Sequence, residues 1–156
     1  MSEIRTLVTF QNSAFNTSEP KNYFINACCY GDDVARWLIE QLRSRGMQTD
    51  AEPGQEDFGW YFGFRAGVTD YQFVIGHRPG DSSDPAVWIG WLERKTGLLG
   101  SMFGGRQRGL QLEGVRAIHS VLSSSPQVSS IRWHHQQDFD AGKEDEGQTE
   151  PTAASP

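Results

Sequence analysis

The chain has 156 residues, of which 37% are hydrophobic and 12% are aromatic, and a chain of this kind forms one compact domain that buries roughly two-thirds of its unfolded surface. The formal net charge is −6, but from Asp138 onward six acids face one lysine, a net of −5, which leaves −1 for the body before them. A nearly neutral body argues against non-specific binding to nucleic acid, which requires clustered Lys and Arg. We therefore expect no nucleic-acid partner.

The cysteines and the apolar stretches indicate the cellular compartment in which the protein is located. Cys28 and Cys29 are adjacent, a spacing at which an unstrained disulfide is difficult to form, and this favours a reducing environment. No basic segment followed by an apolar run opens the chain, and no apolar stretch approaches the ~20 residues of a membrane span. We expect a cytoplasmic protein with no membrane span.

The first part of the chain predicts one strand and one helix. Alternation over 6–10 indicates a strand, and a loop rich in Asn, Ser, Thr and Pro follows over 12–22. A helix is expected to begin at Gly31 and Asp32, which supply an N-cap, and to end at Gly46. Its apolar residues recur at helical spacing: Val34, Trp37, Leu38 and Leu42.

The middle of the chain predicts a β-meander. After a short strand over 47–50 and a turn over 52–55, three strand patterns follow closely over 58–65, 71–77 and 87–94. In the first of them, aromatic residues at every second position share one face: Phe58, Trp60, Phe62 and Phe64. The gaps between these strands suit antiparallel hairpins rather than crossover helices.

The last third predicts a second helix over 110–122 and a final strand over 128–135. Helices that are separate in sequence from a mostly antiparallel sheet are typical of the α+β class. We expect five to six strands with two helices packed on one face, in a single domain over 1–141. Residues 142–156 contain no large apolar side chain, so we expect a disordered acidic tail whose deletion leaves the melting temperature unchanged.

The aromatic strands form the first candidate site. Trp60 and Tyr61 on one strand, with Trp88 and Trp91 on another, form either a stacking surface or core packing, and packing is the ordinary use of such rings. Trp88 and Trp91 are three positions apart, so a regular strand places them on opposite faces, one of them in the core.

Three acids of the body, Glu52, Glu56 and Asp57, precede the aromatic strand. Acids beside aromatic rings suit a protein that captures a basic partner, which requires no catalytic geometry. The alternative is a solvated turn, since neither a partner base nor a set of metal ligands is visible nearby. The residues predicted to form a binding surface are Glu52, Glu56, Asp57, Trp60, Tyr61, Trp88, Phe103 and Arg106.

No cofactor or metal is predicted. His134 and His135 are adjacent, and adjacent residues of a strand point to opposite faces, so the two side chains cannot bind one ion together. An enzyme is the alternative to a binding protein. It would be a small hydrolase or thiol enzyme with a pocket under the glycine-rich loop, lined by Trp60, Trp88, Cys28 and Glu56.

That loop is the stretch from 97 to 109. The stretch from 94 to 109 contains five glycines and four basic residues that flank an apolar tip. The tip consists of Leu98, Leu99, Met102 and Phe103. Three uses fit this composition: a segment of the core, a flap over a pocket, or an anchor for another protein or a second copy of the chain.

Two blocks carry a resemblance, one from Asn26 to Leu38 and one from Glu52 to Phe62. Both are similar to blocks of small bacterial cytosolic proteins of uncharacterised function, and the likeness covers 20–140. It implies no activity. The general plan is also similar, by analogy of size, charge and fold, to that of small immunity proteins that neutralise toxins.

Overall fold

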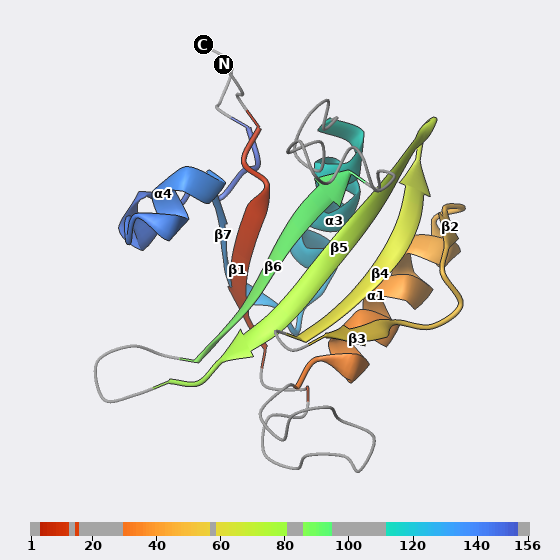
Figure 1. Ribbon diagram of the computed structural model, residues 1–156, viewed down its shortest axis with the longest axis horizontal. Coiled ribbons are helices and arrows are strands. Elements are labelled where there is room, and N and C mark those ends of the chain that lie inside the picture. Colours follow the sequence, from red (N-terminus) through yellow and green to blue (C-terminus); the bar gives the residue numbers. More distant parts are fainter. Residues whose placement is uncertain are drawn as a thin grey trace.

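An antiparallel sheet forms the centre of the computed structural model, which describes residues 4–12, 15, 30–56, 59–80, 86–94 and 112–152 (Figure 1). Within these residues the sheet has seven strands in the order β2-β4-β5-β6-β1-β7, and β3 pairs with the same edge of β4 as β2 does. The strands are β1 (Leu7–Gln11), β2 (Gln48–Thr49), β3 (Gly54–Glu56), β4 (Gly59–Ala66), β5 (Thr69–Arg78), β6 (Val87–Arg94) and β7 (Ser129–His134). The first strand of the chain therefore lies inside the sheet, between β6 and β7.

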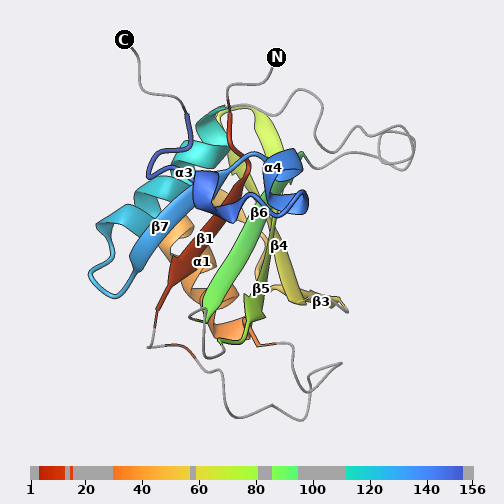
Figure 2. The same ribbon diagram turned by 90° about the vertical axis from the view of Figure 1, so that its left-hand side faces the viewer.

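Two long helices, α1 (Asp32–Ser44) and α3 (Leu112–Ser124), cover one face of the sheet (Figures 1 and 2). A short helix, α4 (Gln136–Asp140), and a 3-10 turn, η1 (Glu144–Glu146), lie on the other face. We call this second face the open face, because neither long helix covers it.

The core lies between the sheet and the two long helices. Alternate residues of the strands point into it, as the two-residue period of a strand requires. On the sheet side the buried residues are Val8, Phe10, Trp60, Phe62, Phe64, Ala66, Tyr71, Phe73, Ile75, Trp88, Leu92 and Trp133. On the helix side they are Val34, Ala35, Leu38, Ile39, Leu42, Val115, Ala117, Ile118, Val121 and Leu122.

The start of α1 shows why the chain needs a glycine there. Gly31 has φ +135°, a backbone conformation that side-chain-bearing residues rarely adopt. A Cβ at this position would lie 3.2 Å from Cδ1 of Trp60 and 3.6 Å from Cζ3 of Trp88. The glycine thus lets the helix begin directly against two core tryptophans.

The α+β class and the antiparallel sheet predicted from the sequence are confirmed. Strands β4, β5 and β6 form the expected meander. The expected turn over 52–55 is different: Gly54–Glu56 pairs with β4, and this short strand and β2 bring the sheet to seven strands. The ring of Tyr61 lies over Gly54, where a Cβ would be 2.4 Å from it, so the pairing needs a residue without a side chain at 54.

The end of the chain differs from the expected disordered tail. Residues 142–152 have described positions, and together with 136–141 they form a segment that we call the C-terminal strap (136–152). Gln148 and Trp133 exchange two backbone hydrogen bonds, and the N–H of Arg5 donates to the carbonyl of Pro151 at 2.7 Å. The strap lacks large apolar side chains beyond residue 141, and backbone pairing with the edge of β7 and with the N-terminal segment holds it instead.

Candidate functional site

A row of aligned side chains crosses the open face of the sheet. Strand register places these residues beside one another in the order Tyr61, Val74, Trp91, Leu7 and His134. Leu7 and Val74 are 1% exposed, while Tyr61 and Trp91 are partly exposed. The centre of this face is therefore apolar and aromatic, although neither long helix covers it.

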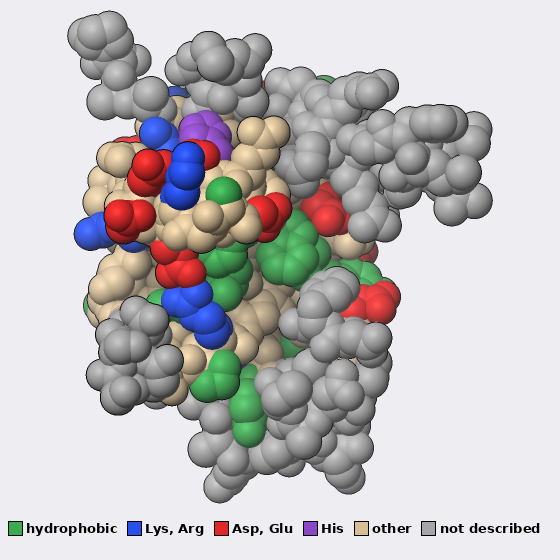
Figure 3. Space-filling model, turned by 60° about the vertical axis from the view of Figure 1, so that its left-hand side comes forward, with side chains coloured by type: hydrophobic (Ala, Val, Ile, Leu, Met, Phe, Trp, Pro, Cys, Tyr) green, Lys and Arg blue, Asp and Glu red, His purple; other side chains and the backbone are tan. Residues whose placement is uncertain are grey.

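Helix α4 forms one wall of a groove on this face. The groove has a volume of about 320 Å³, and it lies between α4 and strands β1, β5 and β6. The residues around it are Leu7, Gly76, His77, Ile89, Trp91, Gln136, Phe139 and Asp140. Figure 3 looks onto this part of the surface and shows hydrophobic side chains in a hollow, with acidic and basic side chains beside it.

The sheet leaves room for this groove because glycine occupies the open face where other strands carry side chains. Gly76 pairs with Ile89, one row away from Trp91, and presents no side chain to the groove. Gly59, in the neighbouring strand, has φ +150°, and a Cβ there would lie 2.3 Å from the carbonyl oxygen of Ile75. A larger residue at 59 would therefore disturb the pairing of β4 with β5.

The rim of the groove is acidic. The side-chain amide of Gln136 donates to a carboxylate oxygen of Asp140 at 3.1 Å, and Asp140 is exposed. Among the described residues, no Lys, Arg or His forms an ion pair with Asp140. An exposed negative charge thus lies beside the aromatic ring of Phe139 and the groove.

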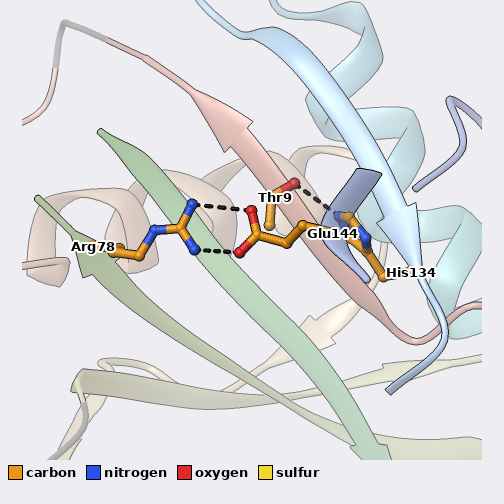
Figure 4. Close-up of polar contacts among 4 residues, drawn as sticks. All are labelled: Thr9, Arg78, His134 and Glu144. Atoms are coloured by element: carbon orange, nitrogen blue, oxygen red, sulfur yellow. Dashed lines mark hydrogen bonds and ion pairs between the residues drawn. The ribbon is translucent and has the colours of Figure 1, made fainter. Parts of the chain in front are cut away.

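A cluster of polar side chains holds the strap against the sheet beside the groove (Figure 4). The guanidinium of Arg78, at the end of β5, donates two hydrogen bonds to the carboxylate of Glu144, one of them at 3.0 Å. These hydrogen bonds hold the pKa of Glu144 below its usual value. Paired hydrogen bonds of this kind fix the relative orientation of the two side chains and also stabilise the contact.

His134 is the most buried ionisable residue of this cluster, at 3% exposed. Its Nε2 lies 3.0 Å from the hydroxyl of Thr9, and its Nδ1 is buried with no hydrogen-bond partner among the described residues. Burial lowers the pKa of His134, and the nearby carboxylate of Glu144 opposes that shift. Gly147 of the strap packs against the ring, where a Cβ would be 2.4 Å from Cε1. The ring is therefore neutral at pH 7 and enclosed by the strap.

A second hollow, of about 440 Å³, lies between α3 and the end of the strap. His119 lines it, and Nδ1 of this ring accepts a hydrogen bond from the indole N–H of Trp133 at 2.9 Å. The proton of a neutral His119 is then on Nε2, which lies 3.3 Å from a carboxylate oxygen of Glu150. Both ring nitrogens thus have partners, and the contact ties the strap to the body.

Trp60 and Trp88, two residues predicted to form the binding surface, lie in the core. They are 3% and 1% exposed and meet at Gly31, so they contribute no exposed surface. Trp91 faces the groove, and the prediction that one tryptophan of the pair Trp88 and Trp91 is in the core is confirmed.

The other predicted residues lie away from the groove or outside the described residues. Glu52 is exposed and forms an ion pair with Arg36 at 3.3 Å, and Glu56 is exposed at the end of β3. Tyr61 lies on the open face, in the same row as Trp91. The positions outside the described residues are Asp57, Phe103, Arg106, Cys28 and Cys29, with the whole of the 97–109 loop.

Sequence reasoning missed most of the groove. Leu7 and Ile89 belong to predicted strands, and alternation alone would have placed them on the face opposite the core. Phe139 and Asp140 belong to the stretch just before the expected tail, where one aromatic among acids gave no periodic signal. The pairing of Arg78 with Glu144 joins residues 66 positions apart and has no local signature.

Neither the models of protein families, nor the curated proteins, nor the solved structures include a significant match to this chain. In the part of the chain that the structure describes, no group of three or more His, Cys, Asp or Glu is arranged to hold a metal ion. The described helices include none that is long and apolar enough to cross a membrane. The groove and its acidic rim are thus the features on which a function can be argued.

Proposed function

We propose that this protein is a non-catalytic binding protein, located in the cytoplasm, whose groove takes an apolar or aromatic segment of another protein that carries a basic residue. The observation that supports this best is the groove itself: an apolar hollow with the exposed carboxylate of Asp140 at its rim. An immunity protein that neutralises a toxin would be one protein of this kind.

The size and lining of the groove fit such a segment. Its volume of about 320 Å³ is at the lower end of the range for ligand sites, roughly 300 to 1,000 Å³. The partly exposed rings of Trp91 and Phe139 are of the type that dominates binding energy at protein interfaces. A groove of this size accepts a few side chains and not a whole helix.

The charge around the groove selects the partner. From residue 138 onward the chain carries a net charge of −5, and much of this charge is on α4 and η1, beside the groove. Complementary charge raises association rates and excludes partners of the same sign. A Lys or Arg of the partner, next to its apolar side chains, would pair with Asp140 and lie near an aromatic face.

Selection of peptides from a random displayed library tests this proposal, because the library samples many sequences and needs no named partner. We expect the enriched peptides to combine aromatic or large aliphatic residues with Lys or Arg. Trp91→Ala should weaken their binding at least about 30-fold. Asp140→Asn should weaken it about 3- to 10-fold at low salt and less at about 0.5 M salt.

Two matched variants serve as controls. Glu40→Gln removes an exposed acid of α1, on the other side of the sheet, and Val68→Ala removes an exposed apolar side chain at the β4–β5 turn. Neither should change peptide affinity. A library that yields no binder, or binders that all four variants leave unaffected, would rule out this groove as the binding site.

A further inference from the structure

The chain itself contains a segment with the chemistry that the groove selects. Between β6 and α3, residues 95–111 carry no acid, and the stretch from 94 to 109 contains four basic residues: Arg94, Lys95, Arg106 and Arg108. The apolar side chains of that stretch lie between the two basic pairs: Leu98, Leu99, Met102 and Phe103. An apolar tip between basic flanks is what the apolar groove and its acidic rim require of a partner.

We propose that a second copy of this chain occupies the groove: residues 97–109 of one copy bind in the groove of its partner, and the reverse, in a two-fold dimer. This inference rests on the proposed function. It adds that the free protein masks its own binding site, and that an external partner competes with self-association.

The position of the segment in the fold favours this arrangement. It leaves the sheet at Arg94, the end of β6, and that strand supplies Ile89 and Trp91 to the groove. Three residues of strand span about 10 Å, so the base of the donated segment lies close to the groove of its own copy. Each copy can therefore donate a segment and accept one around a single two-fold axis.

The length of the segment is sufficient. Seventeen residues separate Arg94 from Leu112, so the tip lies about eight residues from either end and can reach about 25 Å from the sheet. A groove across a dimer interface lies within that distance. Two such insertions bury apolar side chains that are uncommon on the surface of a monomer.

The charges favour association between copies rather than repulsion. The stretch from 94 to 109 carries four basic residues and no acid, and two of the four, Arg106 and Arg108, lie within the donated segment; the chain from residue 138 onward, in contrast, has a net charge of −5. The exposed carboxylate of Asp140 has no cationic partner among the described side chains. Arg106 of the second copy supplies one in the proposed dimer.

Sedimentation velocity and light scattering after size exclusion test the dimer over a range of protein concentrations. We expect a concentration-dependent dimer whose dissociation constant rises with salt. The double variant Leu99→Asp with Phe103→Asp should remain folded by circular dichroism and raise the dissociation constant at least about 30-fold. Val68→Asp, a charge placed at an exposed apolar residue of the β4–β5 turn, should leave the dimer unchanged.

Two further experiments test whether the insertion occurs between copies. Arg106→Glu and Asp140→Arg should each weaken the dimer, and the two changes in one chain should restore it. The loop double variant keeps an intact groove, and Trp91→Ala keeps an intact loop. A mixture of the two variants should therefore form a heterodimer, whereas neither variant should dimerise by itself. Absence of both the restoration and the heterodimer would overturn the inference, as would unfolding of the loop double variant, because residues 97–109 would then belong to the core.

The selected peptides separate this inference from the proposed function. A wild-type protein that is monomeric at all concentrations, yet binds the peptides, contradicts the dimer and leaves the proposed function standing. A dimer that the loop and groove variants abolish, with no peptide bound to the monomeric loop variant, contradicts the external partner and leaves the dimer standing. If the dimer and the external partner both exist, the loop variant should bind the peptides more tightly than the wild type does.

Discussion

At the scale of single residues, His134 combines burial with an incomplete set of hydrogen bonds. Thr9 satisfies one ring nitrogen, and the other is buried without a partner in the described part of the chain. Burial lowers the pKa of His134, and burial likewise lowers the pKa of His77, whose ring lies 4.6 Å from that of Trp88 between centroids. Both histidines therefore favour the neutral form in the folded protein.

The protein is expected to lose stability as the pH falls below about 6.5. An unfolded histidine takes up a proton there, whereas the folded ring with its lowered pKa does not, so the unfolded state binds more protons. The free energy of unfolding should fall by up to about 1.4 kcal/mol per pH unit for each such histidine.

Urea unfolding at pH values of about 7.5 and about 5.5, on either side of the ordinary histidine pKa, measures this loss. His134→Phe should make the two free energies of unfolding more similar, because the titrating group is gone. An equal loss in the variant and the wild type would contradict the assignment to His134. The lowered pKa of Glu144 adds a further loss at more acidic pH, as that carboxylate takes up a proton and its hydrogen bonds with Arg78 weaken.

Two adjacent residues of β4 should respond differently to truncation, because adjacent residues of a strand point to opposite faces. Trp60 is 3% exposed and packs in the core, while Tyr61 lies partly exposed on the open face. Trp60→Ala should lower the free energy of unfolding by about 3–5 kcal/mol, and Tyr61→Ala by less than half as much. Urea unfolding provides the comparison, and an unchanged midpoint for Trp60→Ala would place that ring outside the core.

At the scale of elements, the C-terminal strap is the part of the fold that departs most from sequence expectation. Its described contacts are spread along its length: Glu144 with Arg78, Gln148 with Trp133, Glu150 with His119, and Pro151 with Arg5. Local periodicity predicts elements that bury an apolar face, and the strap from residue 142 onward has none. An ion pair and backbone pairing with distant residues hold it, and such contacts leave no pattern in the sequence.

Deletion of residues 142–156 should therefore lower the melting temperature, by about 5 °C or more if about two to three kcal/mol are lost. The deletion removes Glu144, which pairs with Arg78, and uncovers His134, which Gly147 covers. Differential scanning calorimetry measures the change. Glu146→Gln, at an exposed acid of the same segment, should leave the melting temperature within about 1 °C, and an unchanged value for the deletion would show that the strap contributes no stability.

At the scale of the whole molecule, the two faces of the sheet have different roles. Among the described elements, the long helices α1 and α3 complete the core on one face, and the short α4 covers only part of the other. A sheet that is apolar on both faces but covered fully on one leaves aromatic surface for a ligand. Under the proposed function the groove beside Trp91 is that surface, and a partner segment, from another protein or from a second copy, would complete the second layer.

The fold class and most elements could be predicted from the amino-acid sequence, because helix and strand periods are local: the apolar spacing of α1 and the alternation of β4 are visible within a few residues. The three-residue spacing of Trp88 and Trp91 also divided these tryptophans correctly between the two faces. Three features are visible only in the folded protein: β1 lies between β6 and β7, the strap crosses the open face, and Trp91 and Phe139 share a groove. These features depend on strand order and on single contacts between residues far apart in the chain, and neither has a period that a local stretch of sequence can show.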